Sequence, residues 1–368
     1  MSQSRRRIAI NTGGGDAPGL NAVIRSIVLS SLGRGWEVLG IRKGYEGLFD
    51  TSKIMQLDRD SVRGITHLGG TILGTTNRSN PFEYPVKLPN SEPQLVDRSD
   101  ELVENFRRLK IDALIAIGGD GSMSIANRLA DKGIPIVGVP KTIDNDLSGT
   151  VVTFGFDTAV TVATEAIDRL HSTAEAHERV FVVELMGRYA GWIALNAGVS
   201  ATADVVLIPE IPFDIAAVCD KIMDREAHGR RFSIVVVAEG ARPVDGRMVA
   251  TDQGVGREVR LGGIGRSVAH EIQERTGKET RTVVLGHLQR GGSPTTFDRL
   301  LALRFGAAAV RTVAENTFGV MVALDPPNVL TVPLEVATER MKCVPLDSDT
   351  ILTARDLGIC LGDPEGET

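Results

Sequence analysis

The chain has 368 residues, 42% of them hydrophobic and 24% charged, which is an ordinary globular composition for a protein of two domains. A net charge of −6 and 4% aromatic residues argue against nucleic-acid binding, and no window approaches the roughly 18 apolar residues of a membrane span. Because the three cysteines lie far apart, neither a zinc site nor a disulfide framework is indicated, and we expect a cytoplasmic protein.

Short apolar runs alternate with amphipathic segments along the chain. Continuous Val and Ile runs separated by helices are typical of a parallel sheet covered on both faces, so we expect an α/β protein of the doubly wound type. A helix is predicted from Leu20, and another follows the glycines near residue 120. Strands are predicted within residues 7–11, 111–122, 134–140, 179–187, 204–210, 232–240 and 280–287.

Two segments lack this periodicity. Residues 75–94 contain four prolines and few periodic apolar positions, so we expect a long surface loop. Residues 241–263 are rich in glycine, and we expect an irregular insert.

Glycines follow the first and second of these strands. The stretch "NTGGGDAPGLN" (11–21) would let backbone N–H groups approach a phosphate at a helix N-terminus, although a purely structural turn is an equal alternative. It matches neither a Walker P-loop nor a dinucleotide fingerprint. In "GGDGS" (118–122), Asp120 is placed to bind Mg²⁺ through waters or, alternatively, to cap the next helix.

The stretch "PKTIDND" places Lys141, Thr142, Asp144 and Asp146 directly after a buried strand. One alternative is a solvated polar turn. The other is phosphoryl transfer, in which Asp144 accepts a proton from an attacking hydroxyl, Asp146 positions it or assists the metal, and Thr142 contacts the transferred group.

Basic residues recur near the ends of the later strands. Arginine forks match phosphate groups, so these positions indicate a phosphate-bearing substrate, and Glu239 at the end of "IVVVAEG" would accept a hydrogen bond from a sugar hydroxyl. The basic residues are Arg179, Arg188, Arg281, His287 and Arg290.

Seven motifs together resemble the 6-phosphofructokinase family over nearly the whole chain. They are, in the family's order, "GGGDAPGLNAVIR", "GGTILGTTNR", "IGGDGS", "PKTIDND", "RVFVVELMGRYAGW", "VAEG" and "RTVVLGHLQRGGSPTTFDR". The resemblance implies the glycolytic transfer of a phosphoryl group to the 1-hydroxyl of fructose 6-phosphate. It also implies two doubly wound parallel-sheet domains with the active site in the cleft between them. We expect a donor domain of residues 1–155 plus about 290–335, and a sugar domain of residues 156–289 plus about 336–368.

The resemblance also implies residue roles. Asp144 is the catalytic base, with Thr142, Asp146, Arg188 and Lys141 in the transfer site, and Asp120 is associated with Mg²⁺. The donor phosphates are expected at Gly15, Arg78, Gly119, Asp120, Gly121 and Ser122. The sugar phosphate is expected at Arg179, Met186, Gly187, Arg188, Glu239, Arg281, His287 and Arg290. Arg179 and Arg281 come from a neighbouring subunit in the family, which implies a homodimer or homotetramer.

Two positions disagree about the phosphoryl donor. Gly121 resembles the ATP-dependent enzymes, because the pyrophosphate-dependent ones usually carry an Asp there that would repel the α-phosphate. Lys141 resembles the pyrophosphate-dependent enzymes. We favour ATP, since a clash excludes a donor whereas an additional cation only assists one.

Three alternatives remain. The first is a pyrophosphate-dependent enzyme, and the second is a related NAD or lipid kinase, which lacks the "TIDND" and "GHLQRGG" elements. The third is a non-catalytic homologue that binds sugar phosphates. Arg78 stands one residue later than the arginine of the family pattern, which leaves its role in bridging the two phosphates open.

Overall fold

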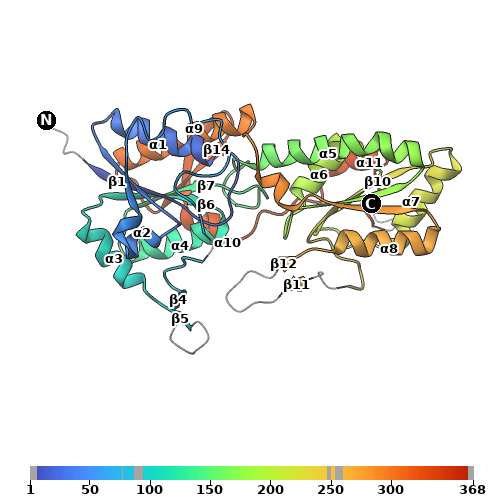
Figure 1. The fold of residues 1–368 in the computed structure, drawn as a ribbon, viewed down its shortest axis with the longest axis horizontal. Helices are drawn as coiled ribbons and strands as arrows, with labels where there is room; N and C mark the ends of the chain where they lie inside the picture. Colours follow the sequence, from blue (N-terminus) through green and yellow to red (C-terminus); the bar gives the residue numbers. More distant parts are fainter. Residues whose placement is uncertain (1–5, 77, 87–93, 247–249, 253–259, 364–368) are drawn as a thin grey trace. The chain divides into compact units, whose positions relative to one another are not determined.

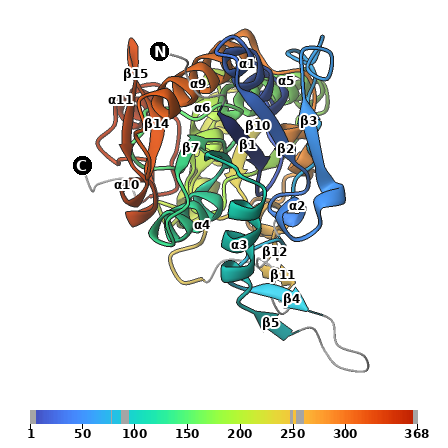
Figure 2. The same cartoon turned by 90° about the vertical axis from the view of Figure 1, so that its left-hand side faces the viewer.

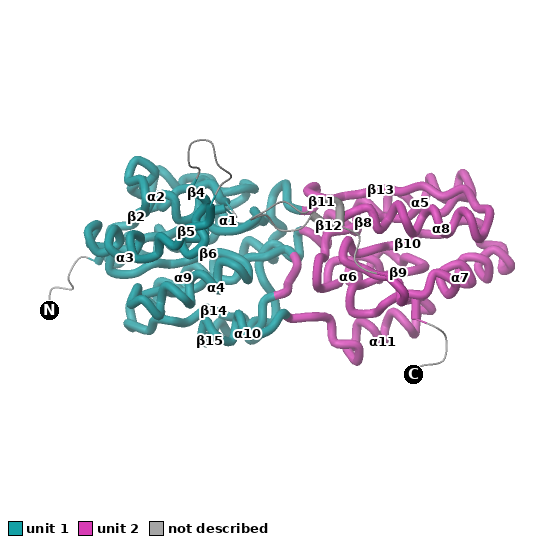
Figure 3. Tube along the Cα trace, turned by 90° about the horizontal axis from the view of Figure 1, so that it is seen from below, with its two compact units in different colours: residues 1–143, 147–158, 290–341 teal, residues 144–146, 159–289, 342–368 magenta. Residues whose placement is uncertain are grey.

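The computed structural model describes residues 6–76, 78–86, 94–246, 250–252 and 260–363. The chain forms two compact units, coloured separately in Figure 3. Unit 1 comprises Met1–Ile143, Leu147–Thr158 and Arg290–Met341, and unit 2 comprises Asp144–Asp146, Ala159–Gln289 and Lys342–Thr368. The three residues Asp144–Asp146, expected in the donor domain, thus group with unit 2.

Unit 1 contains a seven-stranded sheet in the order β15-β14-β7-β6-β1-β2-β3. The inner strands are parallel, whereas β3 and β15 pair antiparallel at the two edges. All six residues of β6 are buried, as the continuous apolar run predicts. The strands are β1 Arg7–Thr12, β2 Glu37–Ile41, β3 Ile54–Leu57, β6 Ala113–Gly118, β7 Ile136–Pro140, β14 Val320–Asp325 and β15 Asn328–Pro333.

Helices cover both faces of this sheet (Figure 2). Alternate residues of β6 enter different cores: Ile115 and Ile117 join the cluster under α1 and α9, while Leu114 and Ala116 join the cluster under α3, α4 and α10. This confirms the doubly wound prediction. The helices are α1 Leu20–Leu32, α2 Glu46–Phe49, α3 Ser99–Arg108, α4 Asp120–Asp131, α9 Thr296–Ala314 and α10 Leu334–Glu339, with a short 3-10 turn at Thr51–Lys53.

Unit 2 contains a four-stranded parallel sheet in the order β13-β8-β10-β9. Helices α7 and α8 bury one face of it, and α6 packs against β9 and β10; α5 begins in unit 1 and continues into unit 2 (Figure 1). The elements are α5 Phe156–His177, β8 Val180–Leu185, α6 Trp192–Ser200, β9 Val205–Leu207, α7 Ile215–Ala227, β10 Ser233–Ala238, α8 Ile264–Thr276, β13 Thr280–Val284, a 3-10 turn at Gly286–Arg290, and α11 Asp349–Asp356.

All seven predicted strands are present, but the two segments expected to be irregular contain strands as well. β4 Tyr84–Val86 pairs antiparallel with β5 Gln94–Val96, and β11 Ala250–Asp252 pairs with β12 Arg260–Leu261. Residues 77, 87–93, 247–249 and 253–259 of these segments lie outside the described residues. β4 is stabilised by tertiary contacts that local sequence does not reveal, since the Tyr84 ring packs against Phe49 and under the Arg98 guanidinium.

Candidate functional site

The carboxyl ends of β1, β6 and β7 bring the predicted donor segments together in unit 1. Thr12 pairs with Ile117, and Gly118 pairs with Pro140. The register continues past the strands, because Gly13 N–H donates to Ile117 O at 2.9 Å and Lys141 N–H donates to Gly118 O at 2.8 Å. The glycine loop, the "GGDGS" segment and the start of "KTIDND" therefore meet at one edge of the sheet, where open α/β sheets bind ligands.

Close contacts explain why several positions at this edge are occupied by glycine. A Cβ on Gly13 would lie 2.6 Å from Ser122 Oγ, and a Cβ on Gly118 would lie 2.2 Å from Ser122 Cβ. Gly14 has a φ of 75°, which glycine adopts without strain. Gly121 differs from these positions, since a Cβ there would meet no atom within 4 Å.

Helix α4 begins at Asp120, and its N-cap residue is Gly119. Asp120 is therefore the first helical residue and not the N-cap residue, and it is exposed. Gly119 has no side chain to cap the first-turn N–H groups. A helix N-terminus of this kind is suited to bind a phosphate.

The segment after β7 is not a solvated turn, so that alternative is wrong. Lys141 is 3% exposed and Thr142 is 9% exposed. The Lys141 Nζ donates a hydrogen bond to Gly15 O, and Thr153 Oγ1 donates to Thr142 O at 2.8 Å. The buried ammonium of Lys141 thus holds the glycine loop against β7.

Two predicted arginines lie in unit 1. Arg290 Nη1 donates to Asp16 O at 3.0 Å, and a Cβ on Gly15 would lie 2.9 Å from the same nitrogen. Arg290, predicted to bind the sugar phosphate, thus packs against the glycine loop. Arg78 is exposed, and its N–H donates to Thr76 Oγ1 at 3.1 Å.

In unit 2, the carboxyl ends of β8 and β10 bring Met186–Arg188 next to Glu239. Leu185 pairs with Ala238, and Glu239 N–H donates to Leu185 O at 2.8 Å. Gly240 N–H donates to Gly187 O at 3.1 Å. A Cβ on Gly240 would lie only 1.9 Å from Arg188 O, so the approach of these two turns requires glycine.

The other predicted sugar-phosphate residues of unit 2 do not share that edge. Arg179 immediately precedes β8, and Arg281 is the second residue of β13, so both lie at the amino-terminal edge of the sheet. His287 is exposed and lies beyond the carboxyl end of β13.

A carboxylate joins the two arginines at the amino-terminal edge. Glu279 Oε2 accepts from Arg179 Nε at 2.7 Å, and Glu279 Oε1 accepts from Arg281 Nη2. The hydrogen bond from Arg179 is the main cause that lowers the pKa of Glu279. Glu279 is a neighbour of Arg281 in the "KETR" stretch, but it was not among the predicted site residues.

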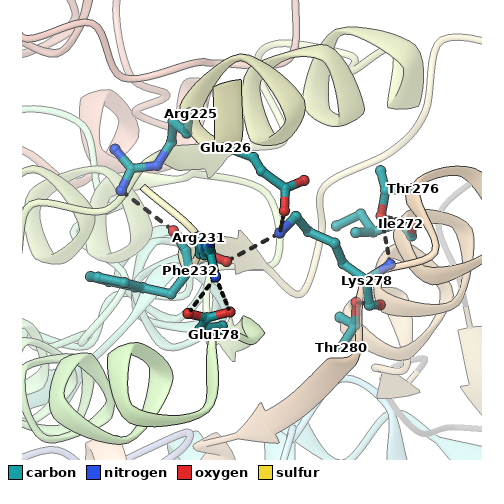
Figure 4. Close-up of polar contacts among 9 residues, drawn as sticks. All are labelled: Glu178, Arg225, Glu226, Arg231, Phe232, Ile272, Thr276, Lys278 and Thr280. Atoms are coloured by element: carbon teal, nitrogen blue, oxygen red, sulfur yellow. Dashed lines mark hydrogen bonds and ion pairs between the residues drawn. The ribbon is translucent and has the colours of Figure 1, made fainter. Parts of the chain in front are cut away.

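Further ion pairs surround this edge of the unit 2 sheet (Figure 4). Arg231 Nη1 contacts Glu178 Oε1 at 3.1 Å, and Lys278 Nζ contacts Glu226 Oε1 at 2.8 Å. Lys278 Nζ also donates to Arg231 O at 3.2 Å, so these contacts tie α7 and the segments before β8, β10 and β13 together.

The carboxylate turn, residues Asp144–Asp146, belongs to unit 2. Its central residue, Asn145, is 4% exposed and accepts a hydrogen bond from Lys342 Nζ at 2.8 Å. Burial lowers the pKa of Lys342 to about 8, although the nearby Asp146 raises it. Lys342 was not predicted, because 197 residues separate it from the turn and its neighbours in the sequence form no motif.

Among the described residues, no group of three or more His, Cys, Asp or Glu side chains is arranged to hold a metal ion. Within the same residues, no helix has both the length and the hydropathy needed to cross a membrane.

Comparisons with known proteins find relatives whose sequences match both units. The ATP-dependent 6-phosphofructokinase of Chloroflexus aurantiacus is 51% identical over 365 residues, which are 99% of each chain. Two Streptomyces coelicolor proteins match 92% of this chain and 96% of their own: a pyrophosphate–fructose 6-phosphate 1-phosphotransferase at 49% identity and an ATP-dependent 6-phosphofructokinase at 50%. ATP-dependent relatives at about 50% identity over nearly the whole chain support ATP-dependent phosphorylation of fructose 6-phosphate, although one relative of similar identity is named as pyrophosphate-dependent.

Solved structures have the same fold. The T-state phosphofructokinase of Pichia pastoris superimposes with a TM-score of 0.79 at 30% identity, covering 92% of this chain and 36% of that chain. The pyrophosphate-dependent phosphofructokinase of Nitrosospira multiformis has a TM-score of 0.78 at 22% identity, covering 99% and 94%. The phosphofructokinase family model matches residues 7–313. The chain belongs to the phosphofructokinase family.

Proposed function

We propose that this chain is an ATP-dependent 6-phosphofructokinase, which transfers the γ-phosphoryl group of ATP to the 1-hydroxyl of fructose 6-phosphate. The observation that carries the choice of donor is the open space beside Gly121, where a Cβ would meet no atom within 4 Å. A nucleotide α-phosphate fits next to a glycine at the second position of α4, whereas an Asp there would exclude it by charge and volume.

In this proposal each unit binds one of the two substrates. Unit 1 binds the donor phosphates through the glycine loop, Arg78 and the start of α4, Gly119–Ser122. Unit 2 binds the sugar through Met186–Arg188 and Glu239. The backbone contacts from Glu239 to Leu185 and from Gly240 to Gly187 support this assignment, since they join the turn and the carboxylate into one surface.

Asp144 takes the proton from the 1-hydroxyl while the γ-phosphoryl group is transferred, and Thr142 and Asp146 orient the reacting groups. The positive charges of Arg188 and Lys141 stabilise the negative charge that develops while the phosphoryl group is transferred. Lys141 acts in part through the glycine loop, because its Nζ donates to Gly15 O.

The carboxylate at the start of α4 is suited to a Mg²⁺ ion that is also bound by the donor phosphates. Asp120 is an exposed carboxylate at a helix N-terminus, and Mg²⁺ commonly takes one or two carboxylates, with phosphate oxygens and waters as the other ligands. When bound, the ion would neutralise charge on the donor phosphates.

A second subunit is required if Arg179 and Arg281 bind the sugar phosphate. The six residues of β8 lie between Arg179 and Met186, and a strand of this length spans about 20 Å at ~3.3 Å per residue. A single fructose 6-phosphate bound at Met186–Arg188 therefore cannot reach the arginine pair of the same chain. We propose that a neighbouring copy supplies the pair, in a homodimer or homotetramer.

The donor test is to assay purified protein with fructose 6-phosphate and either Mg·ATP or Mg·pyrophosphate. We expect turnover with ATP to exceed that with pyrophosphate at least tenfold. The opposite preference would establish the second candidate, a pyrophosphate-dependent enzyme. That candidate is favoured by Lys141, which resembles the pyrophosphate-dependent enzymes, and by the 49% identical Streptomyces relative.

The subunit test is complementation. D144N and R179A/R281A are each expected to be nearly inactive alone, and co-refolded mixtures should recover part of the wild-type activity. Mixed oligomers would contain sites that combine an intact carboxylate with an intact arginine pair. No recovery in mixtures shown by mass to contain both chains would refute sharing of the site.

A further inference from the structure

Lys342 contacts the carboxylate turn through both its side chain and its main chain. Its Nζ donates to Asn145 Oδ1 at 2.8 Å, and its backbone N–H donates to Asp146 O at 2.8 Å. Because the two segments are far apart in the sequence, these bonds are a tertiary restraint on the turn.

The turn has a backbone shape that benefits from such a restraint. Asn145 has a φ of 52°, in the left-handed region that Asn tolerates better than most residues. It stands between Asp144 and Asp146, so a rotation of its backbone would redirect both carboxylates. The buried amide oxygen of Asn145 also needs a hydrogen-bond donor, and Lys342 supplies one.

Lys342 is itself held in place by α6. Trp192 Nε1 donates to Lys342 O at 2.9 Å, and the Lys342 Nζ lies 5.8 Å from the centroid of the Trp192 ring. Burial of an ammonium group is unfavourable, and it lowers the pKa of Lys342. A side chain that is costly to bury and that contacts a catalytic turn is more readily explained by function than by stability.

We propose that Lys342 is a positioning residue for phosphoryl transfer, which holds Asn145 so that the carboxylates of Asp144 and Asp146 keep their reactive orientation. The proposal rests on the proposed function for the role of those carboxylates. It adds a residue to that machinery from the C-terminal segment of the chain. Lys342 acts through Asn145 and does not itself need to touch the substrate.

The principal test compares K342M with the matched control K221M. Methionine keeps the length and apolar stem of lysine but removes its charge and its donor. Lys221 is a partly buried lysine on α7 of the same unit. With whichever donor the wild type uses, we expect K342M to lower kcat about 10- to 100-fold, with both KM values changed less than threefold. K342R should recover part of the loss, and K221M should stay within twofold of the wild type. A kcat for K342M within threefold of the wild type would overturn the proposal.

A double-mutant cycle tests whether Lys342 acts through Asn145. N145G keeps a residue that tolerates a positive φ but removes the amide acceptor. If the proposal is right, K342M/N145G loses no more kcat than the more impaired single variant. If the losses multiply, the two residues act independently and the proposal is wrong. The cycle can also be built with K342A, which likewise removes the hydrogen-bond donor, so it does not depend on K342M folding.

A third measurement does not depend on activity. Amide hydrogen exchange of the peptide covering residues 141–150 should be faster in K342M than in wild type and unchanged in K221M. If the wild type fails to turn over with either donor, the proposed function fails, whereas this measurement still decides whether Lys342 holds the turn. Equal exchange in K342M and wild type would refute the restraint.

Discussion

Replacing Gly121 with aspartate separates folding from donor binding at α4. Gly121 is the second residue of the helix, its φ is not in the left-handed region, and a Cβ would meet no atom within 4 Å. Glycine is about 0.3 kcal/mol less favourable in a helix than aspartate. An acidic residue in the first turn adds ~0.3–1 kcal/mol through the helix dipole. We therefore expect Gly121→Asp to stabilise the folded chain by about 0.6–1.3 kcal/mol.

The same substitution should weaken ATP binding strongly. A carboxylate about 5 Å from a phosphate charge, at an effective dielectric constant of about 20, contributes ~3 kcal/mol of repulsion. This corresponds to a loss of about 100-fold in kcat/KM for ATP. Fructose 6-phosphate binding by unit 2 should be unchanged, and the ratio of pyrophosphate to ATP turnover should rise.

The assays are thermal unfolding, kcat/KM for each donor, and calorimetric titration with fructose 6-phosphate. Gly121→Ala is the matched control, because it adds a Cβ without charge and should alter kcat/KM for ATP less than fivefold. If Gly121→Asp retains kcat/KM for ATP within threefold of the wild type, the nucleotide phosphates do not lie beside α4. In that case the argument for ATP from Gly121 is wrong.

Three further predictions concern unit 2 and the core. Gly240→Ala places a Cβ 1.9 Å from Arg188 O, so we expect it to destabilise the fold by about 2–3 kcal/mol and to raise KM for fructose 6-phosphate; unchanged values of both would contradict the packing of the two turns. Asp144→Asn should lower kcat by at least ~10³-fold while sugar-phosphate binding persists, and an active variant would remove Asp144 from the role of base. Burial raises the pKa of Asp298 to about 6 in the folded state, so the folded chain binds this proton more tightly than the unfolded chain. This carboxyl therefore destabilises the fold increasingly as pH rises from about 4 to 6, by roughly 3 kcal/mol in full. The Tm of Asp298→Asn minus that of the wild type should be larger at pH 7 than at pH 4.5, and a pH-independent difference would show that Asp298 titrates normally.

The sequence by itself determined seven of the strands and the order of the site segments. Buried parallel strands consist of continuous Val and Ile runs, and in this chain glycines or polar motifs directly follow them. For this reason "RIAIN", "ALIAIGG" and "IVGVPKT" could be located without a structure. The proposed donor preference also rests on a local feature, because we expect one carboxylate at residue 121 to be enough to exclude a nucleotide. Four strands of the unit 1 sheet, β2, β3, β14 and β15, were not predicted. For the edge strands β3 and β15 the reason is that their partly exposed residues do not form a continuous apolar run.

Only the tertiary structure decided how those motifs are held and which residues meet. Whether "KTIDND" is solvated depends on what covers it, and the burial of Lys141 and Asn145 is a property of the packed unit. The ion pair between Arg179 and Glu279 depends on the pairing and register of β8 and β13. Lys342 lies 197 residues from Asn145 in the sequence, and no local pattern predicts that the two are in contact. Such contacts between remote segments form only when the sheet and its helices pack.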